Sequence, residues 1–383
     1  MTEKDTRRSF LAKSLTIGSG LAVASMGRSY LSAAPQEAAS KRIKVGVITH
    51  EGGAHVESYL TGLAECVEAG PVVLADSSGK YEDAARKTLG DKLVKTYSDY
   101  AEMLRAEKPI MVLISMEAAL APPVIDAALE ANCHVLAEKP ACVRIKDFEA
   151  LAEKANRKNL HIMLAMANRR NPVVCEARRL IQAGTIGEIY SLEMHYIADQ
   201  TRLKSPSYHT QWYAQKARGG GGHLTWLGIH WLDTAMFVTG SRIREVSGFA
   251  ANVGGQPMDV EDSAVMAMRF DNGTFGTLNS GYYLDRNKQI SLKVWGSQGW
   301  LQLEPLNEIP LTWYSTKDAK EPKIEQYQGT KEPSGYTSYV IAAVRACAGP
   351  EEPPMTTDES LHVLETIFTF YQSAETGEAM EVK

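Results

Sequence analysis

The sequence predicts an α/β protein in which an N-terminal, doubly wound parallel sheet is followed by a domain built on a large, mostly antiparallel sheet. In the first half, short apolar strands recur and a helical segment separates each strand from the next. In the second half, long alternating segments are joined by turns and few helices interrupt them. The 383 residues and the 44% apolar content suit two globular domains.

The first domain, a Rossmann-like domain, is expected over residues 41–165. Between its strands the periodicity predicts helices at 54–69, 81–89, 100–107, 123–132 and 145–158. Its strands are predicted at 43–48, 71–76, 110–114, 135–137 and 161–167.

The second domain is expected over residues 166–383, with an inserted helix at 222–239 and two closing helices at 337–347 and 358–376. The last helices are expected to pack back on the first domain. The turn Asp271-Asn272-Gly273 is typical of a hairpin. Strands are predicted at 189–198, 243–253, 263–270, 275–281, 290–294 and 300–303.

Residues 1–40 are interpreted as an export signal and linker. Arg7 and Arg8 fit the twin-arginine pattern, and a weakly apolar segment at 15–26 follows them. That segment is too short for a stable membrane span. A periplasmic or otherwise exported protein is therefore expected, with no membrane segment in its mature form. A basic tail without targeting function is the alternative.

The charge balance argues against two classes of partner. The net charge of −5 is spread among interspersed acids and bases, so neither nucleic acid nor a membrane surface is indicated. The five cysteines are scattered, and neither a disulfide framework nor a zinc site follows from them.

The turn after the first predicted strand is a candidate nucleotide site. It contains Thr49, His50, Glu51, Gly52 and Gly53 and leads into a helix, whose N-terminus would favour a diphosphate. Because a complete Gly-x-Gly-x-x-Gly fingerprint is not present, nucleotide binding and a purely structural turn both stay open.

Asp76 ends the second predicted strand, at the spacing from Gly52 that is expected of a ribose-binding carboxylate. Ser77 and Ser78 follow it and supply no arginine for a 2′-phosphate. If the turn binds a dinucleotide, these residues favour NAD over NADP.

Lys139 is a candidate catalytic residue. The segment Ala137-Glu138-Lys139-Pro140 begins where an apolar strand ends, which is the edge at which open α/β sheets bind ligands. Burial there can lower the pKa of a lysine and make it an acid/base, or the lysine can orient a substrate hydroxyl. A surface lysine that caps a loop is the alternative.

A glycine run at 219–222 leads into a helix that carries His223, Trp226, His230 and Asp233 at steps of three and four residues. Such a face suits a polyhydroxylated ligand, since rings stack on tryptophan and polar groups meet hydroxyls. A metal site and a buried, structural His230 are the alternatives.

Taken together, these residues resemble the Gfo/Idh/MocA family, named for glucose–fructose oxidoreductase and inositol dehydrogenase. The resemblance covers about residues 41–383 and rests on Glu138-Lys139-Pro140 and on the run from Gly220 to Asp233. Further support comes from the segments at 45–48, 260–264 and 299–301.

The resemblance implies a site in which Lys139 and His230 flank the sugar carbon that loses hydride. It implies NAD as cofactor, and the helical face described above puts His223, Trp226 and Asp233 on the substrate side. The residues expected to hold the cofactor are Thr49, His50, Gly52, Gly53, Asp76, Ser115, Glu138 and Lys139.

Three departures from the family pattern are visible. Thr49 and Glu51 interrupt the glycine fingerprint, Ser115 begins an unusual turn after the third strong strand, and Trp226 stands where many members carry an aspartate. They concern the cofactor turn and the partner of His230, and the fold is barely touched by them.

We therefore expect an exported NAD-dependent oxidoreductase that acts on a hydroxyl of a sugar, cyclitol or glycoside. We expect it to form a homo-oligomer through its C-terminal sheet. Two alternatives stay open: a glycosidase that uses bound NAD for oxidation and elimination, and a carbohydrate-binding relic that has lost NAD. The particular sugar does not follow from the sequence.

Overall fold

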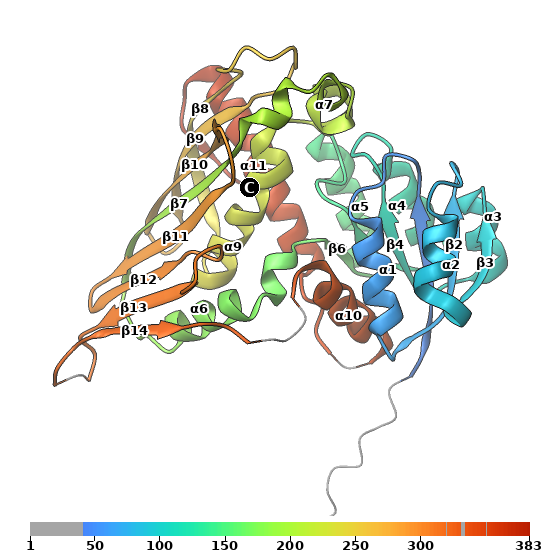
Figure 1. Ribbon diagram of the computed structural model, residues 1–383, viewed down its shortest axis with the longest axis horizontal. Coiled ribbons are helices and arrows are strands. Elements are labelled where there is room, and N and C mark those ends of the chain that lie inside the picture. The colour runs from blue at the N-terminus through green and yellow to red at the C-terminus, as the bar shows by residue number, and fades with distance from the viewer. Residues whose placement is uncertain (1–40, 319, 331–333, 350) are drawn as a thin grey trace, which may run out of the picture. The chain divides into compact units, whose positions relative to one another are not determined.

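Six parallel strands form the first sheet, in the order β3-β2-β1-β4-β5-β6 (Figure 1). The structure, a computed structural model, describes residues 41–318, 320–330, 334–349 and 351–383, so the predicted export signal lies outside the described residues. The strands are β1 (Ile43–Thr49), β2 (Ala69–Asp76), β3 (Leu93–Tyr97), β4 (Met111–Ser115), β5 (His134–Ala137) and β6 (Ile162–Leu164).

Helices separate these strands, and the order reverses at β1 and β4, so the doubly wound prediction is confirmed. The central strand β4 is buried at every residue and its neighbours β1 and β5 at all but one, which explains their largely apolar sequences. The helices are α1 (Val56–Glu65), α2 (Glu82–Leu89), α3 (Tyr100–Glu107), α4 (Ala121–Glu130) and α5 (Ile145–Lys158).

The second sheet has nine strands in the order β14-β13-β12-β11-β7-β10-β9-β8-β15. Every pairing in it is antiparallel except that of β7 with β10. The strands are β7 (Ile189–Asp199), β8 (Ile243–Ala251), β9 (Ser263–Phe270), β10 (Phe275–Leu284), β11 (Gln289–Gly296), β12 (Gly299–Leu303), β13 (Leu311–Ser315), β14 (Ile324–Tyr327) and β15 (Met380–Glu381).

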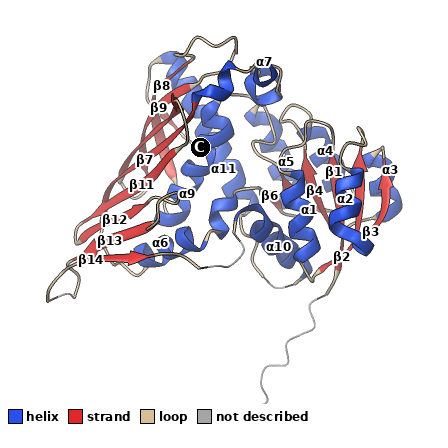
Figure 2. Ribbon diagram, viewed as in Figure 1, coloured by secondary structure: helices blue, strands red, loops and turns tan. Residues whose placement is uncertain are grey.

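Helices cover one face of this sheet, as Figure 2 shows by colour. They are α6 (Pro172–Gln182), α9 (Ile229–Thr239) and α11 (Thr357–Thr376). Alternating side chains of the strands point into this layer and form the core, for example Met266, Met268 and Phe270 of β9. The predicted mostly antiparallel sheet is confirmed.

The predicted helix at 222–239 is interrupted. Leu224–Gly228 forms a π-helical segment (η5), and regular α-helix begins at Ile229. A π turn holds one residue more than an α turn, so it changes which residues share a face on either side of it.

The C-terminal helices contact the first sheet. The Tyr339 hydroxyl of α10 (Gly335–Ala348) donates to the Leu164 carbonyl at 2.6 Å. Ile162 N donates to Thr357 Oγ1 at 3.0 Å. A Cβ at Gly62 of α1 would lie 2.8 Å from Val340, so glycine allows α10 to pack closely there.

A buried ion pair joins the connection after β6 to α9. Arg169 is 5% exposed, and its guanidinium donates to both carboxylate oxygens of Asp233, which is fully buried, at 2.7 to 3.0 Å. Arg169 also donates to Glu359 of α11 at 2.9 Å. The pair therefore fixes the packing of three segments far apart in the sequence.

Asp233→Ala is expected to lower the free energy of unfolding by about 3–5 kcal/mol, because Arg169 would stay buried without its main partner. Glu176→Ala, which breaks an ion pair with the exposed Arg179, should cost about 0–1 kcal/mol and serves as control. Urea denaturation measures both. A stable Asp233→Ala protein with weakened sugar binding would instead support the predicted substrate role of Asp233.

No helix among the described residues is both long and apolar enough to span a bilayer.

Candidate active site

Three predicted cofactor residues form one row at the carboxyl edge of the parallel sheet. Thr49 of β1 is in register with Asp76 of β2 on one side and with Ser115 of β4 on the other. The amide of Glu138 donates to the Ile114 carbonyl at 2.8 Å, which brings the end of β5 to the same edge. Open α/β sheets bind their ligands at this edge.

The turn between β1 and α1 leaves a helix N-terminus open. His55, the residue before α1, has φ 57° and makes no side-chain cap, so the first amides of α1 have no side-chain acceptor. Gly53 is needed for packing, because a Cβ there would lie 2.2 Å from Thr49 Oγ1 and 3.0 Å from the Ser115 carbonyl. The turn thus keeps the close helix–strand approach and the anion-attracting end that a diphosphate requires.

His50 ties this turn to the loop after β4. The Gly52 amide points at its Nδ1 at 3.0 Å and the Glu117 amide points at its Nε2 at 3.1 Å. Burial lowers the pKa of His50, although Glu117 and Glu51 oppose the shift. The neutral imidazole accepts from one of these two amides, because its other ring nitrogen carries a proton. Its contacts on both sides still hold the turn and the loop after β4 close together.

A cavity of about 700 Å³ lies beside this turn. Its walls come from the turn, the loop after β4 and the segment at 210–218 of the second domain. Arg218 pairs with Glu117 across it, with Nε at 2.9 Å from the carboxylate, and the Trp212 indole donates to the Gly52 carbonyl at 3.1 Å. The cavity is lined by His50, Glu51, Gly52, Lys80, Glu117, Leu120, Thr210, Gln211, Trp212 and Arg218.

Both carboxylate oxygens of Asp76 accept hydrogen bonds from residues of the turn that follows it. One carboxylate oxygen accepts from the amide and the hydroxyl of Ser78 at 3.0 and 2.7 Å, and the other accepts from the Tyr81 amide at 2.8 Å. Its side chain is 2% exposed. A ribose hydroxyl would reach this carboxylate only after the Ser78 hydroxyl turns away.

Glu138 and Lys139 form a buried charged pair at the end of β5. Lys139 is 1% exposed and its Nζ lies 3.7 Å from Glu138 Oε1. Burial lowers the pKa of Lys139 to about 8, and Glu138 opposes this shift. Lys139 can therefore exchange its proton near neutral pH, as an acid/base must.

Glu138 is held by two residues of the α1 region. His55 Nδ1 lies 3.0 Å from Oε2, and the Tyr59 hydroxyl donates to the same oxygen. Burial opposes ionisation, but His55, Lys139 and Tyr59 together lower the pKa of Glu138. Its other oxygen, Oε1, is buried and has no hydrogen-bond partner among the described residues.

Trp226 covers Lys139. Its carbonyl accepts from Nζ at 2.6 Å, and Nζ lies 3.4 Å from the centre of its ring. The indole stacks on Tyr213 at 4.7 Å between ring centres and faces His55 at 5.9 Å, and His55 stacks on Tyr336 at 4.2 Å. The lysine is thus shielded by a continuous row of rings that comes from both domains.

His230 lies in the electrostatic field of Lys139 and His55. Burial, Lys139 and His55 together hold the pKa of His230 well below its ordinary value. The imidazole is therefore neutral at pH 7 and able to accept a proton. In a pH–rate profile, the limb due to His230 should accordingly fall below the ordinary pKa range of a histidine.

A buried carboxylate anchors the glycine run. Glu261 accepts from the Gly222 amide at 2.7 Å, the Leu224 amide at 2.9 Å and the Tyr371 hydroxyl at 2.9 Å. Gly222 has no room for a side chain, because a Cβ would lie 1.9 Å from the Glu261 carbonyl oxygen. These contacts set where η5 begins, and hence where Trp226 lies.

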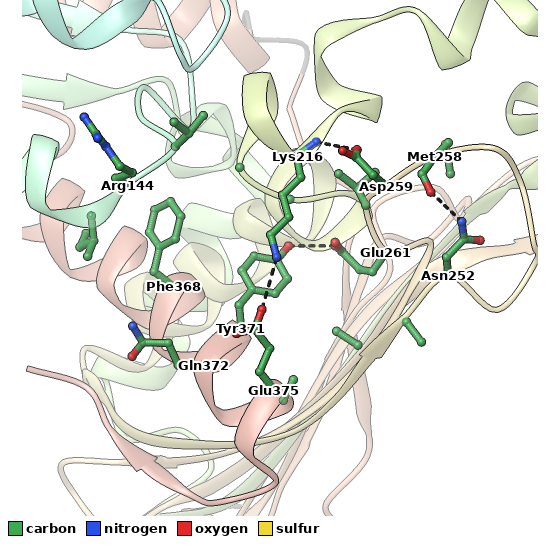
Figure 3. A pocket seen from close by; sticks show the side chains of 18 of the residues that line it. Arg144, Lys216, Asn252, Met258, Asp259, Glu261, Phe368, Tyr371, Gln372 and Glu375 are labelled. Atoms are coloured by element: carbon green, nitrogen blue, oxygen red, sulfur yellow. Dashed lines mark hydrogen bonds and ion pairs between the residues drawn. The ribbon is translucent and has the colours of Figure 1, made fainter.

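A second cavity, of about 750 Å³, borders this anchor. Figure 3 shows the Tyr371 hydroxyl directed at Glu261 and the Lys216 ammonium directed at Glu375 across the opening. Lys216 and Glu375 are mostly exposed, so their pairing contributes little stability.

The structure brings Lys139, His230, Trp226 and Glu138 together but separates the other two predicted substrate residues from them. His223 is fully buried between the rings of Tyr196 and Tyr282, and Asp233 faces Arg169. The π turn of η5 lies between His223 and His230 and explains their separation, because it breaks the three- and four-residue spacing. Asp233 lies in the same regular helix as His230 and is separated from the site by its pairing with Arg169.

Sequence reasoning missed His55, Tyr59 and Tyr336 at this site. His55 and Tyr59 lie at the start of α1. They could have been predicted, because the turn before that helix was already a candidate nucleotide site. Tyr336 comes from the start of α10 and nothing local marks it. Among the described residues no group of histidine, cysteine, aspartate or glutamate side chains is arranged to hold a metal.

These residues fit a dinucleotide. The uncapped first turn of α1 suits its diphosphate, and the cavity beside the turn provides space. The unpartnered Glu138 Oε1 is a buried acceptor that a bound donor would satisfy. Asp76 is in the right place for a ribose but needs the rearrangement of Ser78 described above.

A Rossmann-type sheet joined to an antiparallel sheet domain, with a lysine and a histidine between them, is an arrangement suited to a nucleotide-dependent oxidoreductase. Residues 40–166 match the family described as "Oxidoreductase family, NAD-binding Rossmann fold", and residues 174–302 match "GFO/IDH/MocA C-terminal domain". The chain belongs to the Gfo/Idh/MocA family of oxidoreductases, and its first domain is of the NAD-binding type. The family assignment and the NAD cofactor predicted from the sequence are confirmed.

Characterised relatives act on sugars and cyclitols. Levoglucosan dehydrogenase of Pseudarthrobacter phenanthrenivorans is 28% identical over 57% of this chain, and the match spans 62% of that enzyme's length. The NAD(+)-dependent scyllo-inositol 2-dehydrogenase of Bacillus subtilis is 24% identical over 65% of this chain and 70% of its own length.

Solved structures share the fold. An oxidoreductase domain protein from Kribbella flavida matches with a TM-score of 0.79 and 23% identity, over 90% of this chain and all of that one. Levoglucosan dehydrogenase in complex with NADH and levoglucosan matches with a TM-score of 0.77 and 21% identity, over 88% of this chain and 99% of that one.

Trp226→Ala should raise the pKa of Lys139 from about 8 toward its ordinary value, because water would replace the ring that now covers the ammonium group. The pH dependence of reductive methylation at Lys139, read by mass spectrometry, measures this without any substrate. Trp295→Ala, which removes an indole from β11 of the second sheet, is the control and should change nothing. An unchanged methylation profile in Trp226→Ala would contradict the shielding role.

Proposed function

We propose that the protein is an exported NAD-dependent oxidoreductase that oxidises a hydroxyl of a sugar, cyclitol or glycoside. The observation that carries the proposal is the meeting of a buried lysine of lowered pKa with a neutral histidine between a nucleotide-type sheet edge and a second domain. The activities of levoglucosan dehydrogenase and scyllo-inositol 2-dehydrogenase support the substrate class.

In this proposal His230 accepts the proton of the reacting hydroxyl. Its depressed pKa keeps it neutral over the physiological range and thus ready to act as a base. Bound NAD supplies the acceptor for the hydride that leaves the same carbon. The substrate thereby loses one proton and one hydride, which balances its oxidation to a carbonyl.

Lys139 orients and polarises that hydroxyl. One of its three N–H groups is used by the Trp226 carbonyl, so two are left for a ligand. With a pKa of about 8, the group is mostly cationic below that pH and mostly neutral above it. Activity should therefore fall as the pH rises through about 8, if the cation is the form that assists.

The residues expected to contact NAD lie along the carboxyl edge of the parallel sheet. The backbone of Gly52 and Gly53 and the first turn of α1 would hold the diphosphate. Thr49, His50 and Ser115 line the same sheet edge, Asp76 would take a ribose, and Glu138 with Lys139 would face the nicotinamide end. The carboxylate of Asp76 disfavours a 2′-phosphate, so NAD should bind more tightly than NADP.

Lys139→Ala is expected to lower the turnover of NAD-linked sugar oxidation by roughly a hundredfold or more, the scale of a positioned acid/base or electrostatic group. Formation of NADH on a panel of sugars, cyclitols and glycosides measures it. Lys139→Arg should not restore turnover, because arginine stays charged and differs in shape.

Lys146→Ala, an exposed lysine of α5 near in sequence, is the matched control and should keep full activity. Full activity of Lys139→Ala would show that the site is misplaced. Calorimetry that detects neither NAD nor NADP binding would favour a carbohydrate-binding protein without cofactor. Glycoside cleavage with bound NAD left unconsumed would favour the oxidation–elimination mechanism.

Export is supported by Arg7 and Arg8 and by the short apolar segment after them. The mature protein would then act in the periplasm or outside the cell. Arg7→Lys with Arg8→Lys should leave the full-length chain in the cytoplasm, as fractionation and intact mass would reveal.

Pairing of two copies through the second sheet is also proposed. No described helix covers its other face (Figure 1), where Phe249, Val265 and Phe275 are 79, 49 and 55% exposed. Phe249 and Val265 are in register on neighbouring strands, so they form a continuous apolar patch. A second copy would bury this patch, and light scattering of the purified protein would show whether it is a dimer or larger.

A further inference from the structure

A half-buried arginine lies on a group of aromatic rings beside the candidate active site. The Arg202 guanidinium is 5.5 Å from the ring centre of Tyr282. The Tyr282 hydroxyl shares a hydrogen bond of 2.8 Å with Tyr208, and its ring meets His223 edge-on at 4.4 Å. Tyr196 also contacts His223. We call Tyr196, Tyr208, Tyr282 and the enclosed His223 the tyrosine cluster.

Ring contacts connect the tyrosine cluster to Lys139. Tyr208 packs on Tyr213 at 5.1 Å, and Tyr213 stacks on Trp226 at 4.7 Å. Trp226 in turn covers the Lys139 ammonium. Arg202 is thus placed on the second-domain side of the region where the proposed substrate would contact Lys139.

Lys288 adds a second positive charge near Arg202. It lies in the hairpin between β10 and β11, next to Gln289, which is in register with Ile197 near the end of β7. Arg202 follows β7 by a few residues. The two cations affect one another, because Arg202 adds to partial burial in lowering the pKa of Lys288.

These two charges have no acidic partner. No carboxylate among the described residues lies within 4.0 Å of Arg202 or Lys288. Asp199 lies in the field of Arg202, but it already accepts from the Thr201 amide at 2.7 Å and also lies in the field of Arg286. By contrast Arg169, Arg179 and Arg218 each pair with a carboxylate.

The tyrosine cluster also contains a buried polar atom without a hydrogen-bond partner among the described residues. His223 Nδ1 is 2.7 Å from the Ser280 hydroxyl, but Nε2 is buried and has no partner among the described residues. Burial, Arg202 and Lys288 lower the pKa of His223 to about 3, so the ring stays neutral. Packing of Arg202 on Tyr282 leaves Nε2 of this imidazole without a partner, and a bound ligand would supply one.

We propose that the substrate is an anionic sugar or glycoside, whose carboxylate, sulfate or phosphate group pairs with Arg202 while Lys288 adds attraction at the rim. Arginine suits this role because its fork of N–H donors matches the oxygens of such groups. The inference rests on the proposed function, since it assigns the substrate class of that same site.

The test compares ligands that differ in one group. Methyl β-D-glucoside, methyl β-D-glucuronide, glucose 6-sulfate and glucose 6-phosphate are titrated calorimetrically into the protein with NAD present. At least one anionic sugar should bind about tenfold or more tightly than the neutral glycoside, and added salt should reduce this advantage. The anion that binds best identifies the chemical group.

Arg202→Gln should abolish the advantage and leave binding of the neutral glycoside unchanged. Lys204→Gln, which removes an exposed positive charge from the same segment, is the matched control and should keep it. If the melting temperature shows that Arg202→Gln is unstable, Lys288→Gln replaces it and should reduce the advantage by about two- to threefold.

The inference is overturned if the neutral glycoside binds as tightly as the anionic sugars, if Arg202→Gln keeps the preference, or if none of the probes binds at about 10 mM. Parallel measurement of NADH keeps the two proposals apart. Oxidation of neutral and anionic sugars without preference would uphold the proposed function and refute this inference. Arg202-dependent binding with no NADH from any probe would support the anion site and refute the oxidoreductase.

Discussion

Keeping the Glu138–Lys139 pair charged and out of water is the constraint on which the arrangement of the candidate active site depends. A buried charge is tolerated only where partners replace its hydration. One oxygen of the carboxylate is satisfied by His55 and Tyr59 at the start of α1, and the ammonium is satisfied by the Trp226 carbonyl and ring from the second domain. Both domains must therefore be in place before this pair is stable.

The placement of Trp226 depends on a second buried charge. Glu261 gathers the amides of Gly222 and Leu224, and burial raises its pKa although these amides oppose the shift. A third carboxylate, Asp233, holds α9 against Arg169. The segment from the glycine run through α9 is thus held at its start by Glu261 and within α9 by the pairing of Asp233 with Arg169. This explains why so many polar residues of this region are structural.

The elements whose pattern reflects burial could be predicted from the sequence. The central strands of both sheets, α3 and α5 were found because their apolar spacing is strong. The edge strand β3 was missed, since Val94 and Lys95 are exposed and its alternation is weak. The strands β13 and β14 and helix α6 were missed as well. For β14 the reason is the same, because three of its four residues are exposed.

The candidate site was predictable in part for a different reason. Lys139 and Glu138 follow a strand whose end fixes where they lie, so local sequence suffices. His223 was placed with His230 by assuming regular helical spacing, which η5 breaks. Asp233 does keep regular spacing with His230, but it pairs with Arg169 from a distant segment. Tyr336 and the pairing of Arg218 with Glu117 depend on contacts between distant segments, and no local pattern encodes them.

The π turn of η5 affects how the surroundings of Lys139 can change between related sequences. Because such a turn is equivalent to one residue inserted into an α-helix, deleting one residue from Leu224–Gly228 would rotate everything before it by roughly 100° relative to α9. Trp226 would leave the ammonium of Lys139 and a neighbouring side chain would take its place. The chemical environment of the lysine is therefore encoded by the length of this segment as well as by its composition, and a single codon gained or lost could exchange a hydrophobic shield for a polar partner.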